Sequence, residues 1–75
     1  MRYFKVIITY EVIKGNDDNP QSEQVLYCCA PETFPRTEQL RELFYSLDGV
    51  GKKYLSAEWR AIREEDIPTN EIHLI

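Results

Sequence analysis

Residues 2–13 read RYFKVIITYEVI, and apolar side chains fill every even-numbered position of this stretch except the first. Lys5 and Glu11 lie among the odd-numbered positions. Period-two alternation in β-branched and aromatic residues predicts a strand with one buried face. Ile7 and Ile13 fall on the opposite face, so we expect that face to be only partly exposed to solvent.

A second apolar run follows after a segment that is rich in turn-forming residues. Residues 14–20 read KGNDDNP, and residues 24–30 read QVLYCCA. Because a loop of glycine, asparagine, aspartate and proline separates two apolar runs, an antiparallel hairpin is the simplest arrangement. Pro31 and Pro35 end the second run.

The segment between Thr37 and Gly49 carries the pattern of an amphipathic helix. Its apolar side chains, at positions i, i+3, i+4 and i+7, are Leu40, Leu43, Phe44 and Leu47. Its outward positions are Glu38, Arg41, Glu42 and Tyr45. Thr37 is suited to the N-cap and Gly49 to the C′ position. The pattern therefore predicts one helix whose apolar face packs on the sheet.

The last third of the chain is less regular. Residues 50–55 fit either a glycine-opened loop or a short second helix, and residues 56–63 alternate again and predict a third strand. The charged segment 64–68 leaves that strand, and residues 71–75 fit either a short edge strand or a tail. We expect one α+β domain over residues 1–75. It consists of a small antiparallel β-β-α-β sheet with the helix on one face, and residues 71–75 form either a fourth strand at the edge or a tail.

Charge and hydropathy exclude several classes of protein. The chain has 9 basic and 13 acidic residues and a net charge of −4. An acidic domain repels nucleic acid at long range, so direct DNA or RNA binding is disfavoured. The apolar stretch near the N-terminus is too short to span a membrane and has no cleavage site of a signal peptide. We expect a cytoplasmic protein without a membrane partner.

Chemistry-bearing residues are few. Cys28 and Cys29 are adjacent and have no other cysteine to pair with, so we expect reduced thiols, one buried and one more exposed. A Cys28–His73 dyad requires the last segment to pair beside the second strand; a structural cysteine and a solvated histidine are the simpler interpretation. Neither a metal-ligand spacing nor a phosphate-binding glycine pattern is present. We expect no cofactor, no metal and no enzymatic activity.

Aromatic residues make up 12% of the chain, and several fall on the sheet face that one helix leaves open. Such a face is typical of a protein interface or of a platform that stacks single-stranded nucleic acid. The acidic balance favours a protein partner. Edge-strand pairing through residues 72–75 would instead give a homodimer.

Two acidic stretches complete the candidate interface, because they could mimic phosphates and cover a basic nucleic-acid channel. The interface candidates are Tyr3, Lys5, Asp17, Asp18, Tyr27, Arg60, Glu64, Glu65 and Asp66.

Residues 36–51 read RTEQLRELFYSLDGVG, and this segment resembles a helix of one family of small phage-encoded anti-CRISPR proteins that act on type I-F surveillance complexes. The shared features are Thr-Glu-Gln-Leu and then Phe-Tyr-x-Leu-x-Gly-x-Gly. That family builds several strands before two helices, whereas here a strand-like segment with Trp59 follows the helix. The resemblance implies a small inhibitor that binds a host protein complex in the host cytoplasm. Contacts by Tyr3, Lys5, Tyr27 and Arg60 would fit this implied role.

Overall fold

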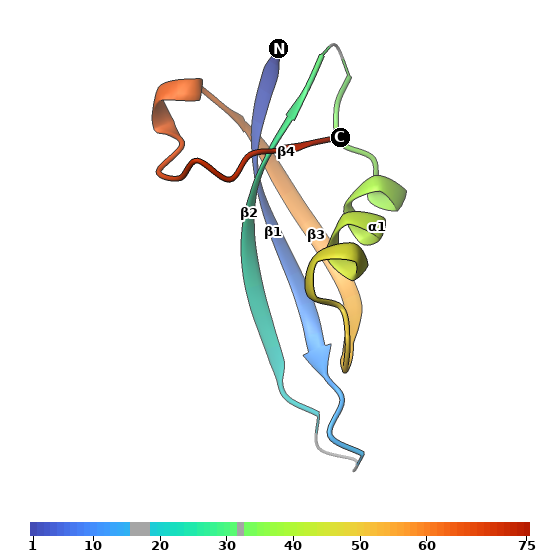
Figure 1. The fold of residues 1–75 in the computed structure, drawn as a ribbon. Helices are drawn as coiled ribbons and strands as arrows, with labels where there is room; N and C mark the ends of the chain where they lie inside the picture. The colour runs from blue at the N-terminus through green and yellow to red at the C-terminus, as the bar shows by residue number, and fades with distance from the viewer. Residues whose placement is uncertain (16–18, 32) are drawn as a thin grey trace.

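The computed structural model describes residues 1–15, 19–31 and 33–75, which form a four-stranded sheet with one helix on one face (Figure 1). The elements in chain order are β1 (Arg2–Val12), β2 (Gln21–Ala30), α1 (Thr37–Asp48), β3 (Lys52–Ile62), the 3-10 turn η1 (Glu64–Asp66) and β4 (His73–Leu74). The strand order is β3-β1-β2-β4. β1 is antiparallel to β2 and β3, whereas β4 is parallel to β2. The predicted α+β class is confirmed, and the sheet is mixed rather than purely antiparallel.

The β1–β2 hairpin supplies most of the core. Its register places Phe4 opposite Cys28 and Val6 opposite Leu26, with all four side chains buried on the helix side of the sheet. The buried even-numbered face that the alternation of residues 2–13 predicts is confirmed at Phe4, Val6 and Ile8, whereas Tyr10 and Val12 are half-buried. The hydrophobic core consists of Phe4, Val6, Ile8, Leu26, Cys28, Ala30, Leu40 and Phe44.

Helix α1 begins one residue earlier than its sequence signal suggests. The N-cap is Arg36 rather than Thr37, and the Arg36 N–H donates to Gln39 Oε1 at 3.0 Å. Leu40 and Phe44 are buried as predicted, but Leu47 is 45% exposed. The ring of Phe44 already contacts the aromatic rings that close this end of the core, so Leu47 lies outside it.

Gly49 ends the helix without the left-handed conformation that a C′ glycine usually adopts. Its φ is −87°, and the positive φ occurs at Gly51, at +73°. The absence of a side chain is what matters at Gly49, because a Cβ there would lie 2.5 Å from Cδ1 and 2.7 Å from Cα of Tyr45. The last turn of α1 therefore packs against its own terminus.

Strand β3 begins at Lys52, so residues 52–55 are neither a loop nor a second helix. A β-bulge explains why the alternation is hidden there. The register with β1 runs from Thr9↔Ser56 to Tyr10↔Tyr54, which leaves Leu55 without an opposite residue. The extra residue shifts the phase of the strand by one position, and a period-two pattern read from sequence is interrupted at that point.

The C-terminal segment adds a short edge strand. Cys28 and Cys29 of β2 lie in register with His73 and Leu74 of β4, and the Ile75 N–H donates to the Cys29 carbonyl at 2.9 Å. The edge-strand alternative for residues 71–75 is therefore the one realised. In the described ranges, no helix is long and apolar enough to cross a membrane.

Candidate functional site

Helix α1 packs on one face of the sheet and leaves the other face uncovered. We call this second surface the open face. It comprises Tyr3, Lys5, Ile7 and Thr9 of β1, Val25, Tyr27 and Cys29 of β2, and Glu58, Arg60 and Ile62 of β3. Each of these side chains is exposed or half-buried, and Val25 is 47% exposed. The face thus combines aliphatic, aromatic and charged side chains in one continuous surface.

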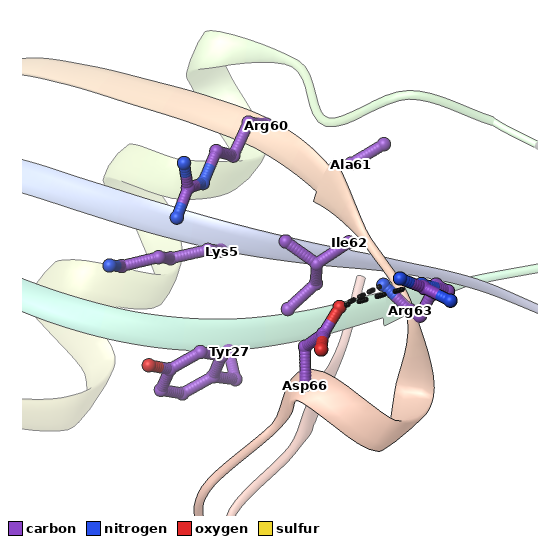
Figure 2. Close-up of a pocket in the computed structure, with 7 residues that line it drawn as sticks. All are labelled: Lys5, Tyr27, Arg60, Ala61, Ile62, Arg63 and Asp66. Atoms are coloured by element: carbon purple, nitrogen blue, oxygen red, sulfur yellow. Dashed lines mark hydrogen bonds and ion pairs between the residues drawn. The ribbon is translucent and has the colours of Figure 1, made fainter.

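A row of three side chains crosses the middle of the open face. Lys5 of β1 lies opposite Tyr27 of β2 on one side and opposite Arg60 of β3 on the other. Figure 2 shows the three side chains projecting from the same side of the sheet. Together with Ala61, Ile62, Arg63 and Asp66 they line an open groove of about 700 Å³. The sheet therefore brings together three residues that the sequence names separately as interface candidates.

The centre of this row is electropositive. Lys5 and Arg60 carry like charges on directly opposite residues, an arrangement that destabilises a pair of strands. Within the described ranges, neither side chain forms an ion pair. Asp66 lies in the same groove, but its carboxylate faces Arg63 instead. An anionic group of a partner could bind at this row without displacing an internal contact.

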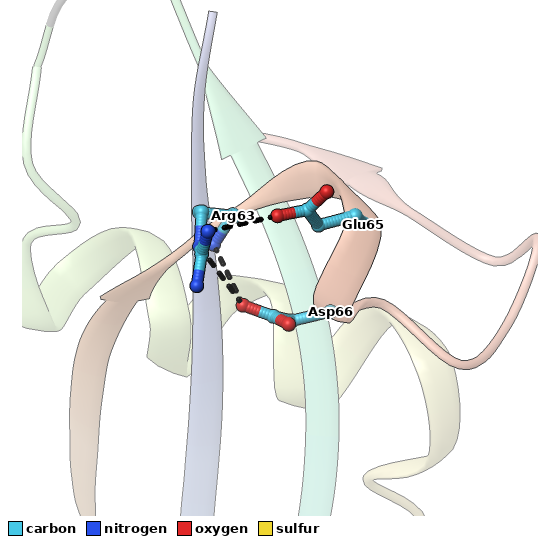
Figure 3. A network of polar contacts seen from close by, with 3 residues as sticks. All are labelled: Arg63, Glu65 and Asp66. Atoms are coloured by element: carbon cyan, nitrogen blue, oxygen red, sulfur yellow. Dashed lines mark hydrogen bonds and ion pairs between the residues drawn. The ribbon is translucent and has the colours of Figure 1, made fainter.

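The acidic triplet Glu64, Glu65 and Asp66 forms η1 at one end of the groove. Arg63 donates to Glu65 at 3.0 Å and lies 3.8 Å from Asp66 (Figure 3). These ion pairs are exposed, so each contributes little to stability. They do offset part of the negative charge, and the triplet is less anionic than the sequence suggests. The other acidic stretch, Asp17-Asp18, lies outside the described residues.

Tyr3 connects η1 to the open face. Desolvation, followed by the nearby Glu64 carboxylate and then Cys29, raises the pKa of the Tyr3 phenol from its ordinary value of 10.0. Tyr3 and Glu64 line the same surface pocket at this end of the sheet. Of the nine interface candidates, the open face and η1 bring together seven.

A cluster of aromatic side chains lies on the helix side of the sheet, beyond the end of α1. We call Arg2, Phe4, Phe34 and Trp59 the Trp59 cluster. The Trp59 and Phe34 rings stack with centroids 5.5 Å apart, and the Arg2 guanidinium lies 4.9 Å from the Phe34 centroid. Phe4 is buried beneath Trp59.

Trp59 lies opposite the buried Val6 on the inner side of the sheet, yet its side chain remains 40% exposed. The sequence contains no direct measure of how far a helix will extend across a sheet. The relevant signal is the helix length, because α1 has 12 residues and spans about 18 Å, less than the length of an 11-residue strand.

The Cys28 thiol is not an activated nucleophile. Cys28 lies in register with His73, the pairing that a dyad would need. However, burial and then the neighbouring Cys29 raise the pKa of the Cys28 thiol to about 11, so the thiol is protonated at neutral pH. An activated catalytic cysteine has a lowered pKa instead. The expected pair of one buried and one more accessible thiol is confirmed.

Comparisons with known proteins leave the surface to be interpreted on its own chemistry. Among the residues whose placement is described, no group of three or more histidine, cysteine, aspartate or glutamate side chains could hold a metal ion. The chain matches no family model, no curated protein and no solved structure.

Proposed function

We propose that this chain is a non-enzymatic protein-binding module that docks on a partner protein through its open face. The observation that carries the proposal is the Arg60–Lys5–Tyr27 row. Two cations that form no ion pair with a described residue lie beside a tyrosine and are flanked by the half-buried side chains of Ile7 and Ile62. This composition matches that of binding hot spots, where arginine and tyrosine are enriched. The partner surface best suited to this row carries carboxylates that face Lys5 and Arg60.

The resemblance of residues 36–51 gives the proposal a finer form. In that form, the module is a small phage or mobile-element inhibitor, similar to an anti-CRISPR protein, that occupies a surface of a host complex in the host cytoplasm. The resembling segment is mostly α1, whose Leu40 and Phe44 are buried in the core. Its role in the proposal is to hold the sheet, while the opposite face makes the contact.

An affinity capture from bacterial lysate tests the proposal, provided that it compares three baits. The first is the wild-type chain, and the second is Lys5→Glu/Arg60→Glu, which reverses the charges of the central row. The third is Lys14→Glu/Arg41→Glu, which makes the same change of net charge at two exposed positions off the open face. We expect one stoichiometric protein with the first and third baits and its loss with the second. Equal capture by all three baits would contradict docking through the open face.

A single-stranded nucleic acid is the second candidate ligand, favoured by one observation. The groove beside Tyr27 contains three cations, Lys5, Arg60 and Arg63, against one carboxylate, Asp66. Cationic grooves with stacking aromatic side chains bind single strands with little sequence preference. A gel shift with a single-stranded oligonucleotide at low salt distinguishes the two functions. A shift that Lys5→Glu/Arg60→Glu abolishes would favour the nucleic acid, and no shift would remove this candidate.

A further inference from the structure

The outer edge of β3 is a second candidate binding surface, separate from the open face. β3 lies at the end of the sheet order, so one side of the strand has no neighbouring strand among the described residues. Two hydrogen bonds at the end of β1 show to which neighbouring strand its alternate residues point. The Val12 N–H donates to the Pro20 carbonyl on the β2 side, and the Ile13 N–H donates to the Gly51 carbonyl on the β3 side. Odd-numbered residues of β1 therefore bond to β3.

The register between β1 and β3 then shows which backbone groups of β3 point away from the sheet. Odd-numbered residues of β1 lie opposite Ser56, Glu58, Arg60 and Ile62, so the N–H and C=O groups of these four residues point inward to β1. The groups of the alternate residues Ala57, Trp59 and Ala61 consequently point outward, away from the sheet. In the described part of the chain, these outward groups have no hydrogen-bond partner.

The first half of the same edge is covered in three ways. The Lys52 N–H donates to the Gly49 carbonyl at 3.1 Å, and the Tyr54 N–H donates to the Tyr45 hydroxyl at 2.9 Å. The bulge at Leu55 then separates this covered half from the regular half. Proteins commonly protect edge strands by such contacts and bulges. As far as the structure describes the chain, the half from Ser56 to Ile62 has no such covering hydrogen bond and no bulge. This half also contains no proline.

We propose that a second copy of this chain pairs with the uncovered half of β3, antiparallel to it, about a two-fold axis at Trp59. This inference does not depend on the proposed function, but both use Arg60, and a Lys5→Glu bait separates them because Lys5 is not part of the proposed strand pair. In this register, Trp59 lies opposite Trp59 of the second copy, and Ala57 lies opposite Ala61. All the outward groups are then paired, because each of these residues exchanges both backbone hydrogen bonds with its opposite residue.

Charge selects this register over its neighbours. A two-fold pairing centred on Trp59 places Glu58 of each copy opposite Arg60 of the other, on the same face of the joint sheet. Moving the axis by one residue places Glu58 opposite Glu58 or Arg60 opposite Arg60. Opposite charges on facing residues stabilise a strand pair, and like charges destabilise it. The alternating signs at positions 58 and 60 thus make the edge complementary to itself.

The opposite face of the joint sheet supports the same pairing. The Trp59 ring lies on the helix side and is 40% exposed beside the Phe34 ring, which is 53% exposed. In the dimer, the two Trp59 clusters become neighbours, and aromatic side chains at the centre of an interface contribute strongly to binding. A single pair of strands buries less surface than a standard interface, so we expect a concentration-dependent dimer.

Sedimentation velocity over a range of concentrations tests the proposal with charge variants. The proposed dimer contains two pairs in which residue 58 of one copy faces residue 60 of the other. In the dimer of Glu58→Arg, each pair consists of two arginines, and in the dimer of Arg60→Glu, each pair consists of two glutamates. Each single variant is therefore expected to weaken its own dimer roughly tenfold or more. An equimolar mixture of the two single variants forms heterodimers in which an arginine faces a glutamate at both pairs. In the dimer of the double variant Glu58→Arg/Arg60→Glu, the facing charges are opposite as well. We expect the mixture and the double variant to dimerise like the wild type.

Matched controls separate this effect from net charge and from misfolding. Glu42→Arg and Arg41→Glu make the same changes of charge on exposed positions of α1, and their dimers are expected to match the wild type. Circular dichroism checks that every variant is folded. A wild-type chain that remains monomeric up to millimolar concentration would overturn the proposal. So would single variants that dimerise as well as the wild type, or a mixture that fails to associate.

Discussion

Lys5 and Arg60 lie directly opposite each other on β1 and β3, on the face that α1 leaves open. Like charges in this position oppose strand pairing, and no ion pair with another described residue offsets them. The fold would be at least as stable without one of these charges. A contact with a partner gives a physical reason for both, since a carboxylate between them converts an unfavourable pair into two favourable ones.

The first prediction concerns the effect of this pair on stability. Lys5→Gln removes one of two facing like charges, so we expect it to increase the free energy of unfolding by a few tenths of a kcal/mol. The matched control is Lys53→Gln, because Lys53 lies opposite Glu11 and its removal should be neutral or slightly destabilising. Urea unfolding of both variants gives the comparison. A loss of stability with Lys5→Gln larger than with Lys53→Gln would count against the repulsion.

The second prediction concerns the Tyr45 hydroxyl, which accepts the Tyr54 N–H at 2.9 Å. Tyr45→Phe keeps the ring but removes this acceptor, so we expect a loss of about 0.5–1.5 kcal/mol in the free energy of unfolding. Tyr10→Phe is the control, since in the described structure the Tyr10 hydroxyl has no hydrogen bond. Hydrogen exchange of the Tyr54 amide should accelerate in the first variant alone. An unchanged exchange rate would show that the contact does not protect the edge of β3.

The third prediction separates two reasons for glycine after α1. Gly49→Ala introduces a Cβ within 2.7 Å of the Tyr45 backbone, so we expect overpacking to cost about 1–3 kcal/mol. Gly51 has open space around its Cα but a φ of +73°, so the cost of Gly51→Ala comes from backbone conformation. Gly51→Asn should therefore be tolerated better than Gly51→Ala, whereas Gly49→Asn should be no better than Gly49→Ala. Thermal unfolding of the four variants checks the distinction.

The fourth prediction concerns alkaline pH. The pKa of the Cys28 thiol is about 11 in the folded chain against an ordinary value of 9.0, so the unfolded chain loses this proton first as the pH rises. The folded state binds more protons in that window, and the free energy of unfolding should fall between about pH 9 and 11. Cys28→Ala should reduce this fall. Part of it should remain above pH 10, because the pKa values of Tyr3 and Tyr54 are raised as well.

Chemical unfolding at a series of pH values measures this dependence, and thiol labelling gives an independent readout. At pH 8, a thiol reagent should modify Cys29 before Cys28, since Cys28 is buried and Cys29 is partly accessible. Identical pH dependence in the wild type and Cys28→Ala would show that the buried thiol does not contribute.

The sequence predicts local elements well where a single period persists. Phe4, Val6 and Ile8 are buried as the alternation indicates, and Leu40 and Phe44 are buried as helical spacing indicates. The prediction fails at residues 52–55, where the bulge at Leu55 interrupts the period. Neither the parallel direction of β4 nor the exposure of Leu47 could be predicted, because both depend on the positions of elements that are distant in sequence.

The candidate site is only partly predictable for the same reason. Alternation places Tyr3, Lys5 and Tyr27 on the open face, but only the strand register shows that Lys5 lies between Tyr27 and Arg60. The uncovered half of β3 is invisible in the sequence, since it depends on the strand order and on which backbone groups Tyr45 and Gly49 cover.

Site-specific photocrosslinking in bacterial cells tests the proposed binding surface most directly. A photoreactive phenylalanine analogue replaces Tyr27 in the central row, or Glu42 on the exposed side of α1 as the control. Docking through the open face predicts one discrete protein adduct from position 27, lost when Lys5 and Arg60 are both changed to glutamate, and none from position 42. An adduct from position 42 with none from position 27 would contradict it.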